Sequence, residues 1–104
     1  MANLSAVRIL RTPYSERFVL RNGAGEDFAA LELHFLVDGT VTGTLILFEQ
    51  AKVLEAEIPQ ILKQIDEELL PEVSIQERNL SFTVVVGRVV GSFVPETDDE
   101  REAK

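Results

Sequence analysis

The sequence predicts a single α+β domain over residues 1–95, an antiparallel sheet of about five or six strands with one main helical segment (about 50–70) packed on one face. Three observations predict this class. Segments that alternate apolar and polar residues at period two stand on both sides of one segment with helical spacing. Turn-forming residues separate the strands. The chain of 104 residues is 45% hydrophobic and 27% charged, which is typical of one globular domain.

The expected order of elements is β-β-β-β-α-β, with a sixth strand if the last apolar segment turns back on itself. The first two strands are AVRILRT and ERFVLRN, on either side of TPYS, where Pro13 suits the second position of a β-turn. The loop NGAGED follows. Its two glycines resemble the start of a dinucleotide-binding loop only superficially, because no helix follows and two acids would face the phosphates.

The next two strands, FAALELHFL and TVTGTLILF, have a register that their own pattern selects. A two-residue loop would mix apolar and polar residues on both faces of the hairpin. The three-residue loop Val37–Gly39 instead pairs Phe35 with Val41 and places the apolar pairs on one face. Gly39 is then expected in the left-handed conformation of a G1 bulge. The same reasoning pairs Leu20 with Ala29 in the preceding hairpin.

The segment EQAKVLEAEIPQILKQIDEELLPE carries apolar residues at helical spacing, among them Leu54, Ile58, Ile61, Leu62, Ile65 and Leu69. Pro59 would cost about 3 kcal/mol inside a helix but little in its first turn. We therefore expect the main helix at about 58–70, with a looser helical turn before it and Pro71 at its end.

In the last segment, LSFTVVVGRVVGSF, apolar residues would point to both faces of a strand. The pair Gly87-Arg88 is interpreted either as a tight turn or as a bulge. A partly exposed apolar segment of this kind marks a contact surface. The alternative is a central strand that is buried on both faces. Residues 96–104, after Pro95, are expected to form an acidic disordered tail. The predicted interaction surface comprises Val84, Val85, Val86, Arg88, Val89 and Val90.

Charge is distributed unevenly along the chain, whose formal net charge is −8. Residues 1–25 carry four arginines and one glutamate, a charge of +3, and the remainder carries six bases and 17 acids, a charge of −11. The acidic bulk argues against general affinity for nucleic acid. The N-terminal bases form either an anion-binding patch or ion pairs with carboxylates of the same chain or of a second copy, and the second interpretation is favoured. The predicted basic patch comprises Arg8, Arg11, Tyr14, Arg17 and Arg21.

The sequence offers few candidates for chemistry. It has no cysteine and a single histidine, His34, which the predicted register places on the polar face beside Glu32 and Thr42. A general base needs an orienting partner and a pocket, so we interpret His34 as a surface residue. No spacing of acids suits a metal ion. No catalytic residue, cofactor or metal site is therefore assigned.

These features predict a small acidic protein-interaction module without catalytic activity. Its expected partner is a second copy, in a homodimer formed through a partly exposed apolar region of the sheet, and a different protein partner is the next possibility. A cytoplasmic location is expected, because the N-terminus has no secretory signal pattern and no apolar run reaches about 18 residues. Neither a nucleic acid nor a membrane is an expected partner. The alternative is a small-molecule-binding domain with an apolar pocket between sheet and helix. An enzyme that uses Glu32 and His34 is a third hypothesis.

Overall fold

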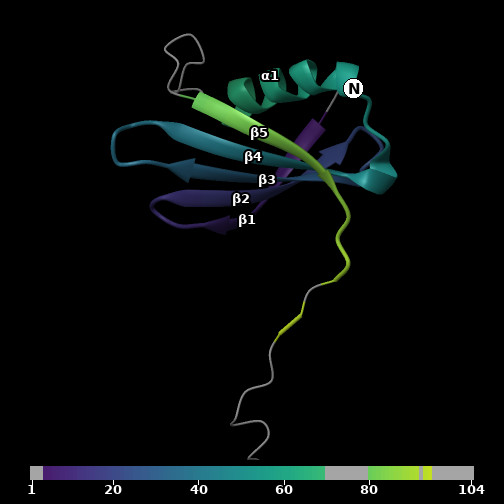
Figure 1. Ribbon diagram of the computed structural model, residues 1–104, viewed down its shortest axis with the longest axis horizontal. Coiled ribbons are helices and arrows are strands. Elements are labelled where there is room, and N and C mark those ends of the chain that lie inside the picture. Colours follow the sequence, from purple (N-terminus) through teal and green to yellow (C-terminus); the bar gives the residue numbers. More distant parts are fainter. Residues whose placement is uncertain (1–3, 70–79, 92, 95–104) are drawn as a thin grey trace, which may run out of the picture.

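The computed structural model describes residues 4–69, 80–91 and 93–94. They form one five-stranded sheet, in the order β1-β2-β3-β4-β5, and one helix, as Figure 1 shows. This arrangement confirms the predicted α+β class and the order of its elements. The strands are β1 (Leu4–Arg11), β2 (Ser15–Asn22), β3 (Asp27–Phe35), β4 (Val41–Phe48) and β5 (Leu80–Gly87).

The first four strands form an antiparallel meander, whereas β5 lies parallel to β4. The parallel pairing follows from the connection, because a helix returns the chain from the end of β4 to the level at which β4 begins. The two-residue period of β5 is the same in either orientation, so the pattern alone did not reveal this direction. Gly87 is the last residue of β5, and the described residues after it form no sixth strand.

The predicted registers of both hairpins are confirmed. Phe35 opposes Val41 across the three-residue loop, and Leu20 opposes Ala29. Gly39 has a φ of +90°, in the left-handed region expected of it. The backbone N–H of Thr40 donates to Asp38 Oδ1 at 2.9 Å. Hydrogen bonds from Thr40, with the side-chain one contributing most, hold the pKa of Asp38 below its ordinary value.

The inner face of the sheet, which faces the helix, carries the hydrophobic core. Its central side chains are fully buried, including Leu20, Leu31, Leu33 and Leu45. Strict alternation would place Phe28 on the opposite, outer face, but the β2–β3 register shifts between Leu20 and Arg21. A bulge of this kind reorients one side chain, and Phe28 is 1% exposed as a member of the core.

Two 3₁₀ turns, η1 (Glu49–Ala51) and η2 (Glu55–Glu57), precede the helix α1 (Ile58–Leu69). The predicted loose turn and the place of Pro59 in the first helical turn are thereby confirmed. Ile61 and Ile65 of α1 are fully buried against the sheet. Leu54, which the helical spacing included, lies before η2 and is exposed. The predicted helix end at Pro71 and the predicted tail at 96–104 lie outside the described residues.

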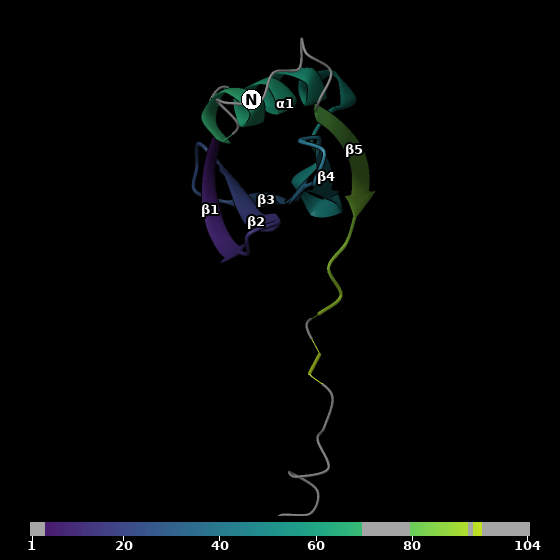
Figure 2. The same ribbon diagram turned by 90° about the vertical axis from the view of Figure 1, so that its left-hand side faces the viewer.

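The N-terminal approach to α1 is held by a local hydrogen bond, in which the backbone N–H of Leu54 donates to Glu57 Oε1 at 3.1 Å. This bond is the main reason that the pKa of Glu57 lies below its ordinary value. In Figure 2 the sheet curls so that β1 and β5 stand on opposite sides, and α1 lies across the space between them. In the part of the chain that the structure describes, no helix has the length and apolar character needed to cross a membrane.

Gly43 of β4 allows a close contact between β4 and a side chain of β5. Gly43 opposes Phe82 in the β4–β5 ladder, and a Cβ atom added to Gly43 would lie 2.5 Å from Phe82 Cδ1 and 3.2 Å from Leu33 Cδ2. The phenyl ring therefore occupies the space that any larger residue at position 43 would need. This close approach explains a glycine in the middle of a buried strand.

We expect Gly43→Ala to lower the free energy of unfolding by about 1–3 kcal/mol, because overpacking displaces the Phe82 ring. Urea denaturation measures the change. Gly23→Ala is the matched control, since an added Cβ there meets nothing within 4 Å, and its effect should stay within about 0.5 kcal/mol. Equal midpoints for the two variants would contradict the packing role of Gly43.

Candidate functional site

β5 lies at the edge of the sheet with β4 as its only neighbouring strand among the described residues. Half of the backbone hydrogen-bonding groups of an edge strand point away from the sheet and can pair with another chain. The alternative interpretation of this segment, a central strand buried on both faces, is therefore wrong. The helix covers only the inner face, and none of the strands in residues 4–69, 80–91 and 93–94 that the structure describes pairs with the outer edge of β5.

The predicted interaction surface divides into a packed part and an exposed part. Val84 is half-buried and packs against the core, whereas Val85 and Val86 are exposed, Val86 at 64%. After Gly87 the chain leaves the sheet as an extended segment, which Figure 1 shows below β5. We call residues 88–91 and 93–94 the C-terminal arm. All of its large apolar side chains are exposed, namely Val89, Val90, Phe93 and Val94.

Phe93 and Val94 were not among the predicted surface residues, although their signal was present in the sequence. The apolar run of β5 continues through Gly91 into these two positions without a charged residue after Arg88. Phe93 is 82% exposed and Val90 is 80% exposed. Large apolar side chains that stand together in solvent at these fractions are typical of a contact surface.

The two edges of the sheet differ in how they are guarded against pairing. The β1 edge has a bulge at Ile9, where the register with β2 shifts, and it carries Arg8 and Arg11. Bulges and charged side chains are the usual devices that prevent pairing at an edge. β5 pairs with β4 in continuous register and contains no charged residue or proline. β5 is therefore the edge at which the described sheet is open to a further strand.

An apolar depression adjoins the exposed edge of β5 on the inner face. It has a volume of about 290 Å³ and lies between the start of α1 and the ends of β4 and β5. Val86 stands at its border, one residue before the end of β5. We call it the edge depression, and its lining consists of Leu47, Val53, Glu55, Ile58, Val84 and Val86.

The outer face of the sheet carries a second apolar feature. One residue from each strand contributes to a cross-strand row in which every neighbour is aliphatic, and the registers of all four strand pairs place these residues side by side. From β2 to β5 the next row toward the β3–β4 turn is polar and consists of Arg17, Glu32, Thr44 and Thr83, whereas Leu10 of β1 opposes Arg17. We call the aliphatic row the outer apolar row: Val7, Val19, Ala30, Ile46 and Val85.

His34 lies where the register predicted it, exposed on the outer face and opposite Thr42. Its Nε2 atom is 3.7 Å from Glu32 Oε1, and Glu32 is shared with Arg17 at 3.6 Å. The side chains of His34 and Glu32 are 48% and 32% exposed. The pair therefore lies on an open face of the sheet and borders none of the three depressions described for this chain.

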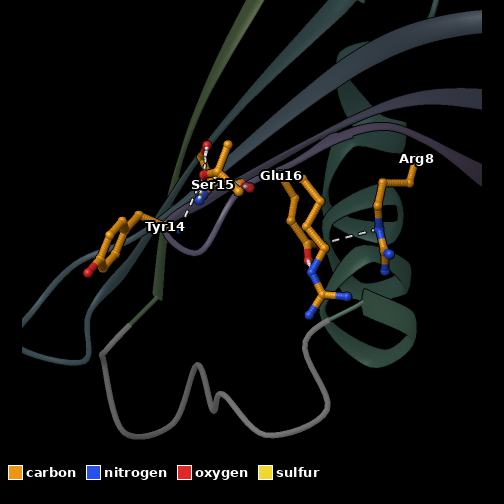
Figure 3. A network of polar contacts seen from close by, with 6 residues as sticks. Arg8, Tyr14, Ser15 and Glu16 are labelled. Carbon is orange, nitrogen blue, oxygen red and sulfur yellow. Dashed lines mark hydrogen bonds and ion pairs between the residues drawn. The ribbon is translucent and has the colours of Figure 1, made fainter.

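The predicted basic patch is divided between the two faces of the sheet. Arg17 and Arg21 belong to the outer face, where they pair with Glu32 and Asp27. Arg8 and Arg11 belong to the inner face and both approach Glu16. All four arginines thus have carboxylate partners within 4.0 Å, in agreement with the favoured interpretation of ion pairs within the chain. Tyr14 is exposed and points away from Glu16, as Figure 3 shows.

Glu16 is the least exposed member of these ion pairs, with 14% of its side chain accessible. Its two carboxylate oxygens lie 4.0 Å from Arg8 Nε and 3.4 Å from Arg11 Nε (Figure 3). The Arg8 guanidinium also stands 5.9 Å from the centre of the Phe18 ring. An open depression of about 530 Å³ adjoins this cluster. Because Glu16 already neutralises Arg11, the depression offers an incoming anion no unpaired cation among its lining residues.

Comparisons with protein-family models, with curated proteins and with solved structures found no match for this chain. The function is therefore inferred from the geometry of the exposed edge, its arm and the two apolar features beside it.

We expect Glu16→Gln to lower the free energy of unfolding by about 1 kcal/mol, because two guanidinium groups lose their shared counter-charge. Chemical denaturation at low and high salt measures the effect, which should shrink as salt screens the charges. Glu68→Gln, on the exposed side of α1, serves as the control and should change stability by less than about 0.5 kcal/mol. An unchanged Glu16→Gln variant would mean that the cluster is only a solvated surface contact.

Proposed function

We propose that this chain is a protein-interaction module without catalytic activity, which self-associates through β5 and the C-terminal arm. The observation that carries the proposal is the unguarded edge of β5, which continues into an arm of exposed apolar residues. An edge of this kind pairs with a further strand through main-chain hydrogen bonds, and alternate side chains provide the specificity. A second copy of the chain supplies both an equivalent edge and an equivalent arm.

Hydrophobic burial supplies the driving force for this association. Each large aliphatic or aromatic side chain that moves from water into a contact contributes about 1.5–3 kcal/mol. The arm offers four such side chains, and Val85 and Val86 at the edge of β5 add two more. These contributions must exceed the entropic cost of association and of ordering the arm. Several exposed side chains in one short segment make this possible.

The electrostatics of the chain oppose association at long range but not at the contact. Two copies with a formal charge of −8 repel one another. The contact segment from Leu80 to Val94 contains a single charged residue, Arg88. Repulsion therefore arises from the bulk of the protein, where salt screens it, while the contact itself is apolar.

The alternative function, a small-molecule site between sheet and helix, has less support. The space between them is filled by fully buried side chains such as Leu45, Ile61 and Ile65. The edge depression is apolar, but its volume of about 290 Å³ lies at the lower limit of ligand pockets and it opens toward the β5 edge. That position suits a side chain of a partner better than an enclosed ligand.

We expect Val85→Lys to weaken self-association at least about tenfold, because a charged side chain on an edge strand prevents pairing. Sedimentation velocity over a concentration series measures the dissociation constant. Val37→Lys is the matched control, since Val37 is 99% exposed in the turn after β3, and it should associate like the unaltered chain. A strictly monomeric unaltered chain at high concentration would sink the proposal.

Raising the salt concentration from about 0.05 M to about 0.5 M should strengthen the association, because salt screens the repulsion between the two acidic copies while the apolar contact remains. The same sedimentation series in the two buffers gives the comparison. If salt instead weakened the association, ion pairs rather than apolar side chains would hold the copies together.

A further inference from the structure

We infer that the C-terminal arm of one copy adds as a sixth, antiparallel strand to β5 of a second copy, and that the exchange is reciprocal. The inference rests on the proposed self-association and specifies which segments meet. A twofold axis perpendicular to the sheet places the arm of each copy along the β5 edge of the other. This arrangement is closed, because each copy donates one arm and accepts one.

Side-chain alternation assigns a contact to each face of the arm. In β5, Val84 and Val86 face the edge depression and Val85 belongs to the outer apolar row. If the arm continues the strand, Val90 and Val94 share the parity of Val84, and Val89 and Phe93 share the parity of Val85. A twofold axis perpendicular to the sheet keeps inner faces on one side and outer faces on the other.

The two apolar features beside β5 therefore receive the two faces of the arm. Val90 reaches the edge depression of the second copy, which is lined by Leu47, Val53 and Ile58 besides the valines of β5. Val94 lies on the same face, four residues farther along the second copy's β5 toward Leu80. Val89 extends the outer apolar row beyond Val85, and Phe93 lies on the same outer face. An arm with apolar residues on both of its faces is suited to a position where both faces are covered.

Charge complementarity supports the same placement. Arg88, the single charged residue of the arm, shares the parity of Val90 and so faces the side of the edge depression. Glu55 is the single charged residue in the lining of that depression, and it is exposed. The arm thus brings a guanidinium to the surface on which a carboxylate stands.

A second copy fits the arm better than the arm's own β5 does. To pair with its own strand, the arm would have to reverse at Gly87-Arg88 in a tight hairpin turn. The structure has no turn there: β5 ends at Gly87, and residues 88–91 continue without one. Figures 1 and 2 both show the arm leading away from the sheet. An extended arm meets an edge strand only on another molecule.

Cross-linking between two single variants tests the inference, because the chain has no cysteine of its own. Full-length Glu55→Cys and Val90→Cys chains are mixed and treated with a short bismaleimide. The inference expects a covalent dimer that contains one chain of each kind, identified by mass. Val37→Cys replaces Val90→Cys in the control mixture, and it should give no more than background linkage.

A chain that carries both Glu55→Cys and Val90→Cys tests the competing geometry. Linkage within single chains, without covalent dimers, would show that the arm folds onto its own depression and would overturn the inference. Sedimentation of the uncross-linked chain tests self-association separately from exchange of the arm. A dimer without linkage of Glu55→Cys to Val90→Cys would overturn arm exchange and leave self-association standing, whereas a monomer would overturn both.

Substitution of the arm provides a second measurement that does not depend on cross-linking geometry. Val90→Ser and Phe93→Ser should each weaken the dimer at least about tenfold and leave the unfolding of the dilute monomer unchanged. Val37→Ser should change neither quantity. Dimers of Val90→Ser and Phe93→Ser that are as tight as the unaltered dimer would overturn the inference.

Discussion

The burial of α1 on the inner face of the sheet determines the rest of this structure. Ile61 and Ile65 are fully buried against the leucines of β2, β3 and β4. Because α1 returns the chain to the level at which β4 begins, the last strand enters parallel to β4 and takes the edge of the sheet. Because the helix packs only on the inner face, the outer face and the β5 edge are exposed in the described part of the chain. The candidate site is thus a consequence of how the core is closed.

The local structure was predictable from sequence wherever a buried face constrained it. The three-residue loop at Val37–Gly39 follows because a slip of one residue would mix apolar and polar side chains on both faces of the hairpin. Pro59 fixed the start of the helix for a steric reason. The direction of β5 and the bulge at Phe28 were not predictable, since the first depends on the path of the connection and the second on how the β2–β3 turn region packs. Both are tertiary effects that leave no trace in the period of a strand.

The candidate site was predictable only in part, for related reasons. The apolar run after Leu80 marked the right segment, but period alone did not distinguish an edge strand from a central one, and Val84 was grouped with exposed neighbours although it packs against the core. The predicted basic patch grouped residues by their nearness in sequence. Arg8 and Arg17 lie on opposite faces. Arg8 lies opposite the buried Phe18 on the inner face, whereas Arg17 is next to Phe18 in β2 and therefore points to the outer face.

The bulge at Ile9 has a consequence for how far an assembly of this protein can grow. A sheet with two receptive borders can add molecules head to tail without limit, because every addition presents a fresh border, and such growth produces filaments. In this chain the irregular backbone at Ile9 and the adjacent arginines make the β1 border a poor acceptor. If the proposed association begins at the opposite border, its growth ends after one step and the assembly stays finite.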